Sequence, residues 1–164
     1  MTGQREQGSP VIRTLLYGVA VALVLAIIAV QSYLNITDVR EQERAEQTLR
    51  SLRDIRIALE KYYRQTGTYP DLAKEGAASD LKILDFVDNN GHLVSFAEMF
   101  GKPQLPETPG NNKIKGSNAV HNVTDFKNAS MSGGWNYNYP EKTGEIHANL
   151  PHDVYSESIE WEEY

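Results

Sequence analysis

The sequence predicts an α+β protein in which one long N-terminal helix packs on a small antiparallel β-sheet. Three observations lead to this prediction: an uncharged apolar run near the N-terminus, a helical pattern of apolar residues after it, and two alternating runs near the C-terminus. A chain of 164 residues has room for one small domain beside a membrane anchor. Because much of the apolar content lies near the N-terminus, the domain itself must build a modest core.

The apolar run extends from Thr14 to Val30 and contains no charged residue in 17 positions. Extended to Leu34, it reaches the roughly 20 residues that a helix needs to cross a bilayer. A cleaved secretory signal would have a shorter apolar region and a small-residue cleavage site, and no such site precedes Asn35. We therefore expect residues 1–13 to be a short cytoplasmic segment or leader, residues 14–34 a single transmembrane helix, and residues 35–164 an extracytoplasmic domain. The two arginines and one glutamate of the first segment favour an inside N-terminus.

The stretch from Gln31 to about Gln65 has the periodicity of an amphipathic helix. Apolar residues recur on one face, namely Leu52, Ile55, Leu59 and Tyr62. Glu46–Arg50 and Glu60–Arg64 have the spacing of stabilising helical ion pairs. No Pro or Gly occurs from Val19 to Thr66, so anchor and amphipathic segment are expected to form one continuous helix that ends at Gly67.

The middle of the chain is less regular. Asp80 to Val87 fits either a short helix or an extended run, and Leu93 to Phe100 has the spacing of a short helix. Leu105 to Gly116 is rich in Pro, Gly and Asn and is therefore expected to be a loop.

Two alternating runs near the C-terminus predict an antiparallel hairpin. Gly134 to Tyr139 places Trp135 on the same face as two tyrosines, and Gly144 to Leu150 places Ile146 on the same face as Ala148 and Leu150. We expect the face with Trp135 and Ile146 to pack on the helix core residues named above. His147 is then expected to face solvent, and residues 152–164 to form an exposed, poorly ordered acidic tail.

Composition and motifs argue against several functions. The net charge is −6 and we find no basic stripe, so no nucleic-acid partner is expected. The chain has no cysteine, and its four histidines do not have zinc-enzyme spacing. The acidic residues around Asp88 do not follow a calcium-loop pattern, which favours a polar turn. Neither a nucleophile elbow nor a phosphate-binding glycine loop is present. We predict no enzymatic activity, cofactor, metal or small-molecule substrate, and we expect the clustered aromatics to be core rather than a stacking platform.

Two segments resemble the type IV pilin-like family, which includes the pseudopilins of type II secretion. IRIALEKYYRQTGTYPDL, from Ile55 to Leu72, resembles the end of the long pilin-like helix, and GGWNYNYPEKTGEIHANLP, from Gly133 to Pro151, resembles a C-terminal hairpin of pseudopilin-like proteins. Together with the anchor, the resemblance covers about half of the chain. It implies a pilin-like fold, other pilin-like subunits as partners, and a place in the bacterial cytoplasmic membrane.

The resemblance also implies a processing site and an assembly position at the N-terminus. Gly8 corresponds to the leader glycine of prepilins, so the leader peptidase would cut between Gly8 and Ser9. Arg13 then occupies the place of the family's glutamate, which meets the N-terminal amine of a neighbouring subunit during assembly. Arg13 reverses that charge, which indicates a tip, minor or accessory subunit.

The sequence thus favours one function and leaves two alternatives open. The first is a non-enzymatic subunit of a bacterial envelope filament or secretion system. The second is a membrane-tethered extracytoplasmic binding module that does not polymerise. A third, a coiled-coil scaffold formed by residues 31–66, ranks last because the apolar heptads extend for only about two repeats.

Overall fold

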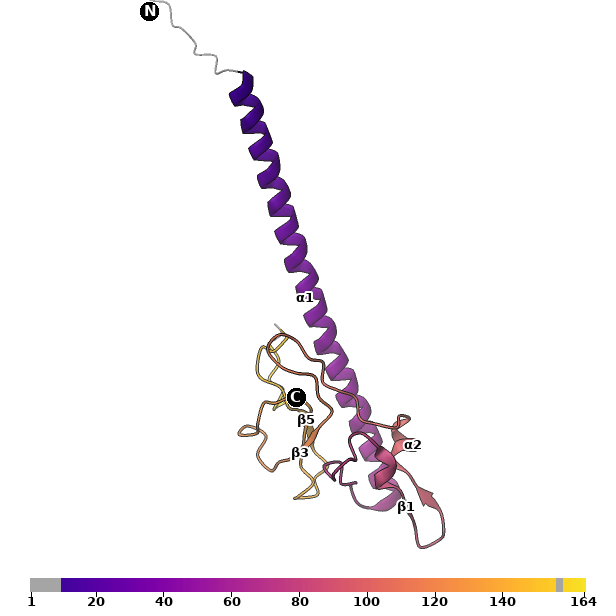
Figure 1. Ribbon diagram of the computed structural model, residues 1–164. Coiled ribbons are helices and arrows are strands. Elements are labelled where there is room, and N and C mark those ends of the chain that lie inside the picture. Colours follow the sequence, from indigo (N-terminus) through magenta and orange to yellow (C-terminus); the bar gives the residue numbers. More distant parts are fainter. Residues whose placement is uncertain (1–9, 156–157) are drawn as a thin grey trace, which may run out of the picture. The chain divides into compact units, whose positions relative to one another are not determined.

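The computed structural model describes residues 10–155 and 158–164, and its elements run in the order α1, η1, β1, β2, α2, β3, β4, β5 (Figure 1). The chain divides into two compact units, with the boundary after Arg40. One long helix and two small sheets confirm the predicted α+β class.

The helix α1 extends without a break from Pro10 to Thr66, which confirms the prediction of one continuous helix. Pro10 suits the first helical turn because its missing amide hydrogen has no helical acceptor there. The helix ends because Gly67 adopts a left-handed conformation, with φ +72°, and its N–H donates to the carbonyl of Tyr63 at 2.7 Å.

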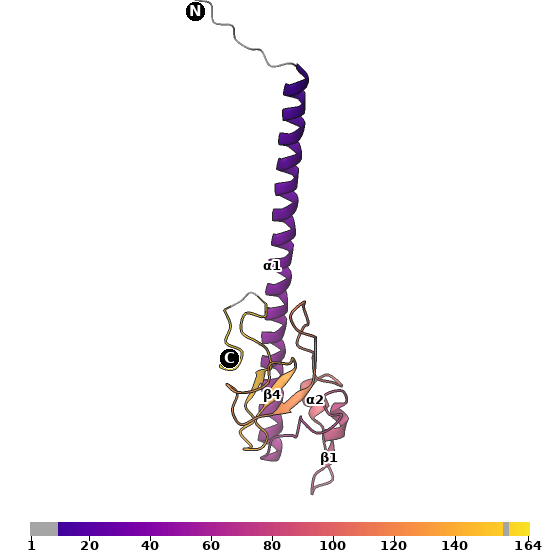
Figure 2. The ribbon, with the colours of Figure 1, turned by 60° about the vertical axis from the view of Figure 1, so that its left-hand side comes forward.

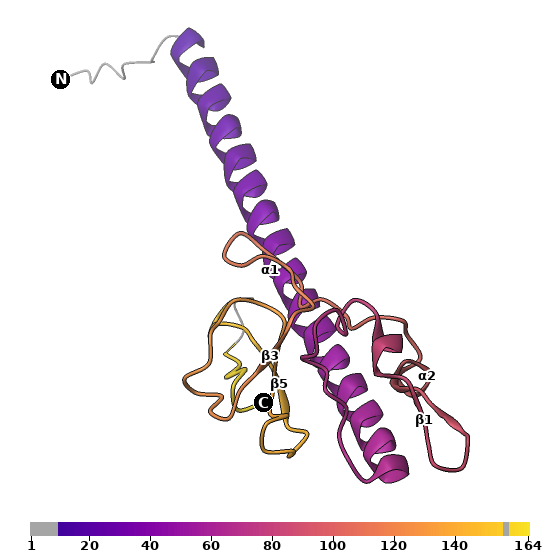
Figure 3. The same cartoon turned by 60° about the horizontal axis from the view of Figure 1, so that its bottom comes forward.

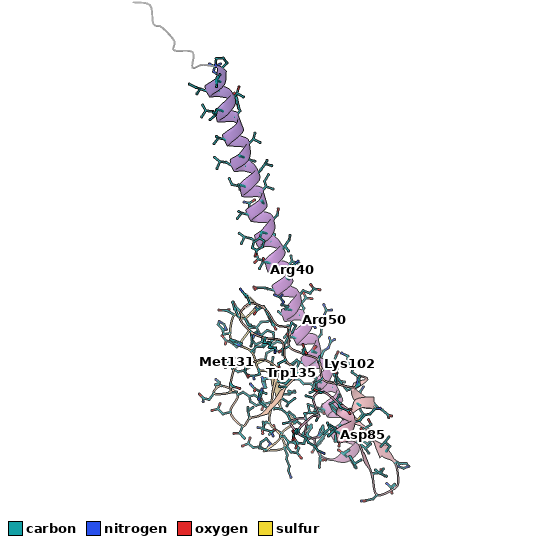
Figure 4. All side chains as sticks on the ribbon, in the orientation of Figure 1. Arg40, Arg50, Asp85, Lys102, Met131 and Trp135 are labelled. Atoms are coloured by element: carbon teal, nitrogen blue, oxygen red, sulfur yellow. The ribbon has the colours of Figure 1, made fainter. Side chains whose placement is uncertain are left out.

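The part of α1 before Arg40 exposes large apolar side chains on every side of the helix (Figure 4). It contains a window long and apolar enough to cross a membrane, and none of that window is buried within the protein. The hydroxyl of Thr14 donates to the carbonyl of Pro10 at 3.0 Å, so even this polar group is satisfied inside the helix.

The part of α1 after Arg40 carries a buried stripe. Leu52, Ile55 and Leu59 are at most 1% exposed, and Tyr62 is also buried. The sheet of β3, β4 and β5 lies on one side of this part of α1, while β1 and α2 lie on the other (Figures 1 and 3). Trp135 and Ile146 are fully buried in the same core.

The main sheet has the order β3-β4-β5, with bounds Val120–Asn122, Trp135–Tyr137 and Ile146–Ala148 (Figure 2). Antiparallel pairing of β4 with β5 sets Trp135 opposite Ala148 and Tyr137 opposite Ile146, which confirms the predicted hairpin. The expectation of an all-antiparallel sheet is wrong, because β3 pairs with β4 in parallel. The strands β4 and β5 lie within longer alternating runs of the sequence, whereas no alternating apolar run surrounds Val120–Asn122.

A smaller lobe holds η1 (Leu81–Leu84), β1 (Phe86–Val87), β2 (Leu93–Val94) and α2 (Phe96–Phe100). The segment from Asp80 to Val87, which fitted either a short helix or an extended run, contains both elements. The short helix η1 comes first and the strand β1 follows it. The helix expected from Leu93 begins only at Phe96, because Leu93 and Val94 pair with β1. Ser95 caps α2 by accepting the N–H of Glu98 at 3.3 Å.

The prediction of a poorly ordered acidic tail is wrong. Val154, Tyr155 and Trp161 are each 1% exposed and belong to the core. The rings of Tyr155 and Trp161 meet edge to face with centroids 5.9 Å apart, and the hydroxyl of Tyr155 donates to the carbonyl of Pro109. Three apolar side chains thus hold this segment against the domain despite its acidic composition.

Candidate functional site

The residues predicted for processing and assembly lie at the start of the chain. Gly8 and Ser9 fall outside the described residues. Arg13 lies in the second turn of α1 and is exposed. Within residues 10–155 and 158–164, no carboxylate lies within 4 Å of its guanidinium.

His147 does not face solvent as expected, since it is only 5% exposed. It lies opposite Asn136 on the face of the sheet that points away from Trp135, and the ring of Phe126 covers it with centroids 4.3 Å apart. The segment after β3 therefore covers a face that the sequence pattern marked as external. The Nε2 atom of His147 contacts a carboxylate oxygen of Glu145 at 3.0 Å, while Nδ1 has no hydrogen-bond partner in the described part of the chain.

The acidic segment around Asp88 forms a polar turn between β1 and β2. One carboxylate oxygen of Asp88 accepts the N–H groups of Asn90 and His92 at 2.8 and 2.9 Å. These hydrogen bonds lower the pKa of Asp88 below its usual value. Across the residues that the structure describes, no group of three or more His, Cys, Asp or Glu side chains could hold a metal ion.

Most of the clustered aromatics pack inside the domain. Tyr62 meets the ring of Phe96 edge to face at 5.9 Å, and the hydroxyl of the buried Tyr137 donates to the carbonyl of Pro70 at 2.9 Å. Burial raises the pKa of Tyr137 well above its usual value, because the anionic phenolate would lose its hydration. Tyr63 differs, since it is 43% exposed and stacks on Tyr69 with centroids 4.6 Å apart.

The most distinctive surface is a groove of about 610 Å³ on the exposed side of α1. Five of its lining residues are cationic, one is acidic and three are apolar or aromatic: Arg50, Arg53, Arg56, Lys61 and Arg64; Glu60; and Leu49, Ile57 and Tyr164. We call this surface the basic groove. Its positive charge contrasts with the net charge of −6 of the whole chain.

The cations of the basic groove are weakly neutralised. Arg50 bonds Glu46 at 2.7 Å, which confirms that predicted helical pair, but its side chain remains 69% exposed. Arg53 approaches Asp54 only to 3.8 Å. Lys61 and Arg64 have no carboxylate within 4 Å among the described residues, so the predicted Glu60–Arg64 pair is absent. A carboxylate oxygen of Glu60 instead accepts a hydrogen bond of 3.4 Å from the hydroxyl of Tyr69.

Arg56 connects the basic groove to the sheet. Its guanidinium donates to the carbonyl oxygen of Ile146 through Nη2 at 2.7 Å and Nε at 3.2 Å, and Nη2 also donates to the main-chain oxygen of Tyr164 at 2.7 Å. Desolvation by partial burial lowers the pKa of Arg56, whereas the nearby Tyr164 and Glu145 raise it. Arg56 is thus a structural cation that fixes one wall of the groove, whereas Lys61 and Arg64 have no carboxylate within 4 Å among the described residues.

Sequence reasoning missed the basic groove because it treated the charged residues of α1 as helical pairs. A count by helix face would have found it. At about 100° per residue, Arg50, Arg53, Ile57, Lys61 and Arg64 fall within an arc of about 80°, opposite the buried stripe. The arrangement can hold an anionic partner that also presents apolar surface to Leu49, Ile57 and Tyr164.

Comparisons with protein-family models, with curated proteins and with solved structures each found no match to this chain.

Proposed function

We propose that this protein is a non-enzymatic, pilin-like subunit of a bacterial envelope filament or secretion system. It would be anchored by one transmembrane helix in the cytoplasmic membrane, with its domain on the outer side. The observation that carries the proposal is the division of α1. One part exposes apolar side chains on all sides, and the other buries only one stripe.

This division suits assembly because each part of α1 has a different partner. Lipid and neighbouring transmembrane helices would cover the apolar part, since a helix satisfies its backbone hydrogen bonds internally. The later part holds its own sheet on one face and leaves the opposite face open. The resemblance of Ile55–Leu72 and Gly133–Pro151 to pseudopilin-like segments supports the same function.

Cross-linking in membranes tests the proposal. The chain has no cysteine, so Val24→Cys introduces a single reactive thiol in the transmembrane segment and Ile28→Cys a second one on the same helix. We expect the double variant to give a ladder of cross-linked copies that stays in the membrane after carbonate washing. Release of full-length protein by carbonate would refute the anchor, and an absence of all multimers would refute assembly.

A second candidate, a tethered binding module that never polymerises, is favoured by Arg13. An exposed arginine near the end of an apolar helix suits a lipid phosphate at the inner face of the membrane.

If Arg13 instead sets the assembly position, Arg13→Glu should insert normally and lengthen the ladder of cross-linked copies. Arg13→Lys is the matched control, and the mass of the mature chain reports cleavage between Gly8 and Ser9. Equal ladders in wild type and Arg13→Glu, with normal insertion, would remove the assembly role.

A further inference from the structure

We infer that the basic groove is a contact between two copies of this chain, and that it receives the acidic segment of α1 around Glu43 and Glu46 of a second copy. This inference rests on the proposed function, because it names the partner surface for assembly. It concerns only the folded unit after Arg40.

The two surfaces lie on one face of the same helix. At about 100° per residue, Glu43 and Glu46 fall in the arc that holds Arg50, Arg53, Ile57, Lys61 and Arg64. Glu43 is exposed and has no cation within 4 Å among the described residues. This face therefore begins acidic and continues basic, and Glu46 and Arg50 bond each other at 2.7 Å where the two parts meet.

The opposite charges of the two surfaces can offset the net charge of the chain. Two copies, each with a net charge of −6, repel one another on average. Association then needs a cationic patch on one copy and a carboxylate patch on the other, and α1 supplies both. Exposed Ile57 and Tyr164 add apolar area that ion pairs in water alone would lack.

The charge order also selects a shifted arrangement. Two parallel copies in register would place Arg50 against Arg50 and Glu43 against Glu43, which is repulsive. A shift of seven residues, about 10 Å at 1.5 Å per residue, places Glu43 against Arg50 and Glu46 against Arg53. The contact is heterologous, since it joins two different parts of the surface.

Paired single-cysteine variants test the inference in full-length protein in membranes. One copy carries Gln47→Cys beside the acidic segment, and the other carries Ile57→Cys in the groove. Both positions are uncharged and exposed, so the ion pairs are kept. With a short bis-maleimide, we expect the mixed Gln47–Ile57 product to exceed both homodimer products.

A charge swap separates the groove from general association. Arg53→Glu in the Ile57→Cys copy should reduce the mixed product roughly five- to tenfold, because attraction becomes repulsion at an exposed pair. Adding Glu46→Arg to the Gln47→Cys copy should restore it. Lys115→Glu, an exposed charge reversal away from the groove, is the matched control and should change nothing.

Each other outcome contradicts one of the two proposals. If the Val24→Cys, Ile28→Cys variant gives a cross-linked ladder but the mixed Gln47–Ile57 product is missing, the groove contact is overturned and the proposed function stands. Dominant homodimer products would show a symmetric contact, and a product of Ile57→Cys with a protein of different mass would show another occupant. Either result overturns this inference. Absence of the ladder as well would overturn the proposed function.

Discussion

Leu59 shows how a single side chain determines the stability of the domain. It is 1% exposed within the core, whereas Ile57, two positions earlier on the same helix, is 48% exposed. We expect Leu59→Ala to lower the free energy of unfolding by about 2–5 kcal/mol, because it leaves a cavity. Ile57→Ala is the matched control and should change it by less than about 0.5 kcal/mol. Urea unfolding followed by tryptophan fluorescence measures both, and equal effects would contradict the packing of α1.

Tyr137 links a single side chain to the stability of the protein in alkali. Burial raises the pKa of Tyr137 in the folded state, and an unfolded tyrosine titrates near pH 10. The folded state therefore holds this proton more tightly, so its contribution to stability is complete below about pH 10 and is lost as the pH rises further. We expect the urea midpoint to fall as the pH rises above about 10, and to fall less steeply in Tyr137→Phe. Tyr63→Phe, at an exposed tyrosine, should retain the wild-type slope.

At the scale of elements, the junction of β3 and β4 depends on Gly134. Its φ of +83° is close to that of Gly91, +84°, but a side chain at Gly134 would overlap the carbonyl of Ala119, whereas Gly91 faces open space. That carbonyl accepts the N–H of Trp135 at 2.8 Å. Gly91→Ala should cost about 1–2 kcal/mol from backbone strain alone, and Gly134→Ala clearly more. Thermal unfolding compares the two, and similar melting temperatures would argue against the tight junction.

The elements that could be predicted from sequence are those whose period repeats. The long helix and the hairpin of β4 and β5 repeat their patterns often enough to be recognised. The strand β3 could not be predicted in this way. Its parallel pairing with β4 depends on how the chain between the two strands crosses back over the sheet. The burial of His147 follows from the same return, since Phe126 comes to cover a face that local alternation marks as exposed. The cations of the basic groove could be found in the sequence as a charge pattern on one helix face. The contribution of Tyr164 to the lining of the groove could be found only from the folded structure.

At the scale of the whole molecule, the acidic C-terminal segment belongs to the domain. Composition predicted disorder there, yet Trp161 is fully enclosed. We expect Trp161→Ala to lower the free energy of unfolding by about 3–5 kcal/mol, whereas Tyr164→Ala, at a side chain 53% exposed, should cost far less. Chemical unfolding measures both, and limited proteolysis should cut the Trp161→Ala protein faster near residue 155. If the Trp161→Ala protein had native stability, the C-terminal segment would not be part of the core.

The hydrogen bonds of Arg56 have a kinetic consequence. The guanidinium reaches a carbonyl at Ile146, 90 residues later in the chain, and another at Tyr164, 108 residues later. Contacts this distant in sequence require large loops to close before they contribute, so the domain should fold in milliseconds to seconds rather than microseconds. The helix forms much earlier, and its apolar stripe stays uncovered until the strands arrive. During that interval the nascent chain is open to aggregation and to binding by chaperones. The length of the interval depends on how long β5 takes to pack against α1.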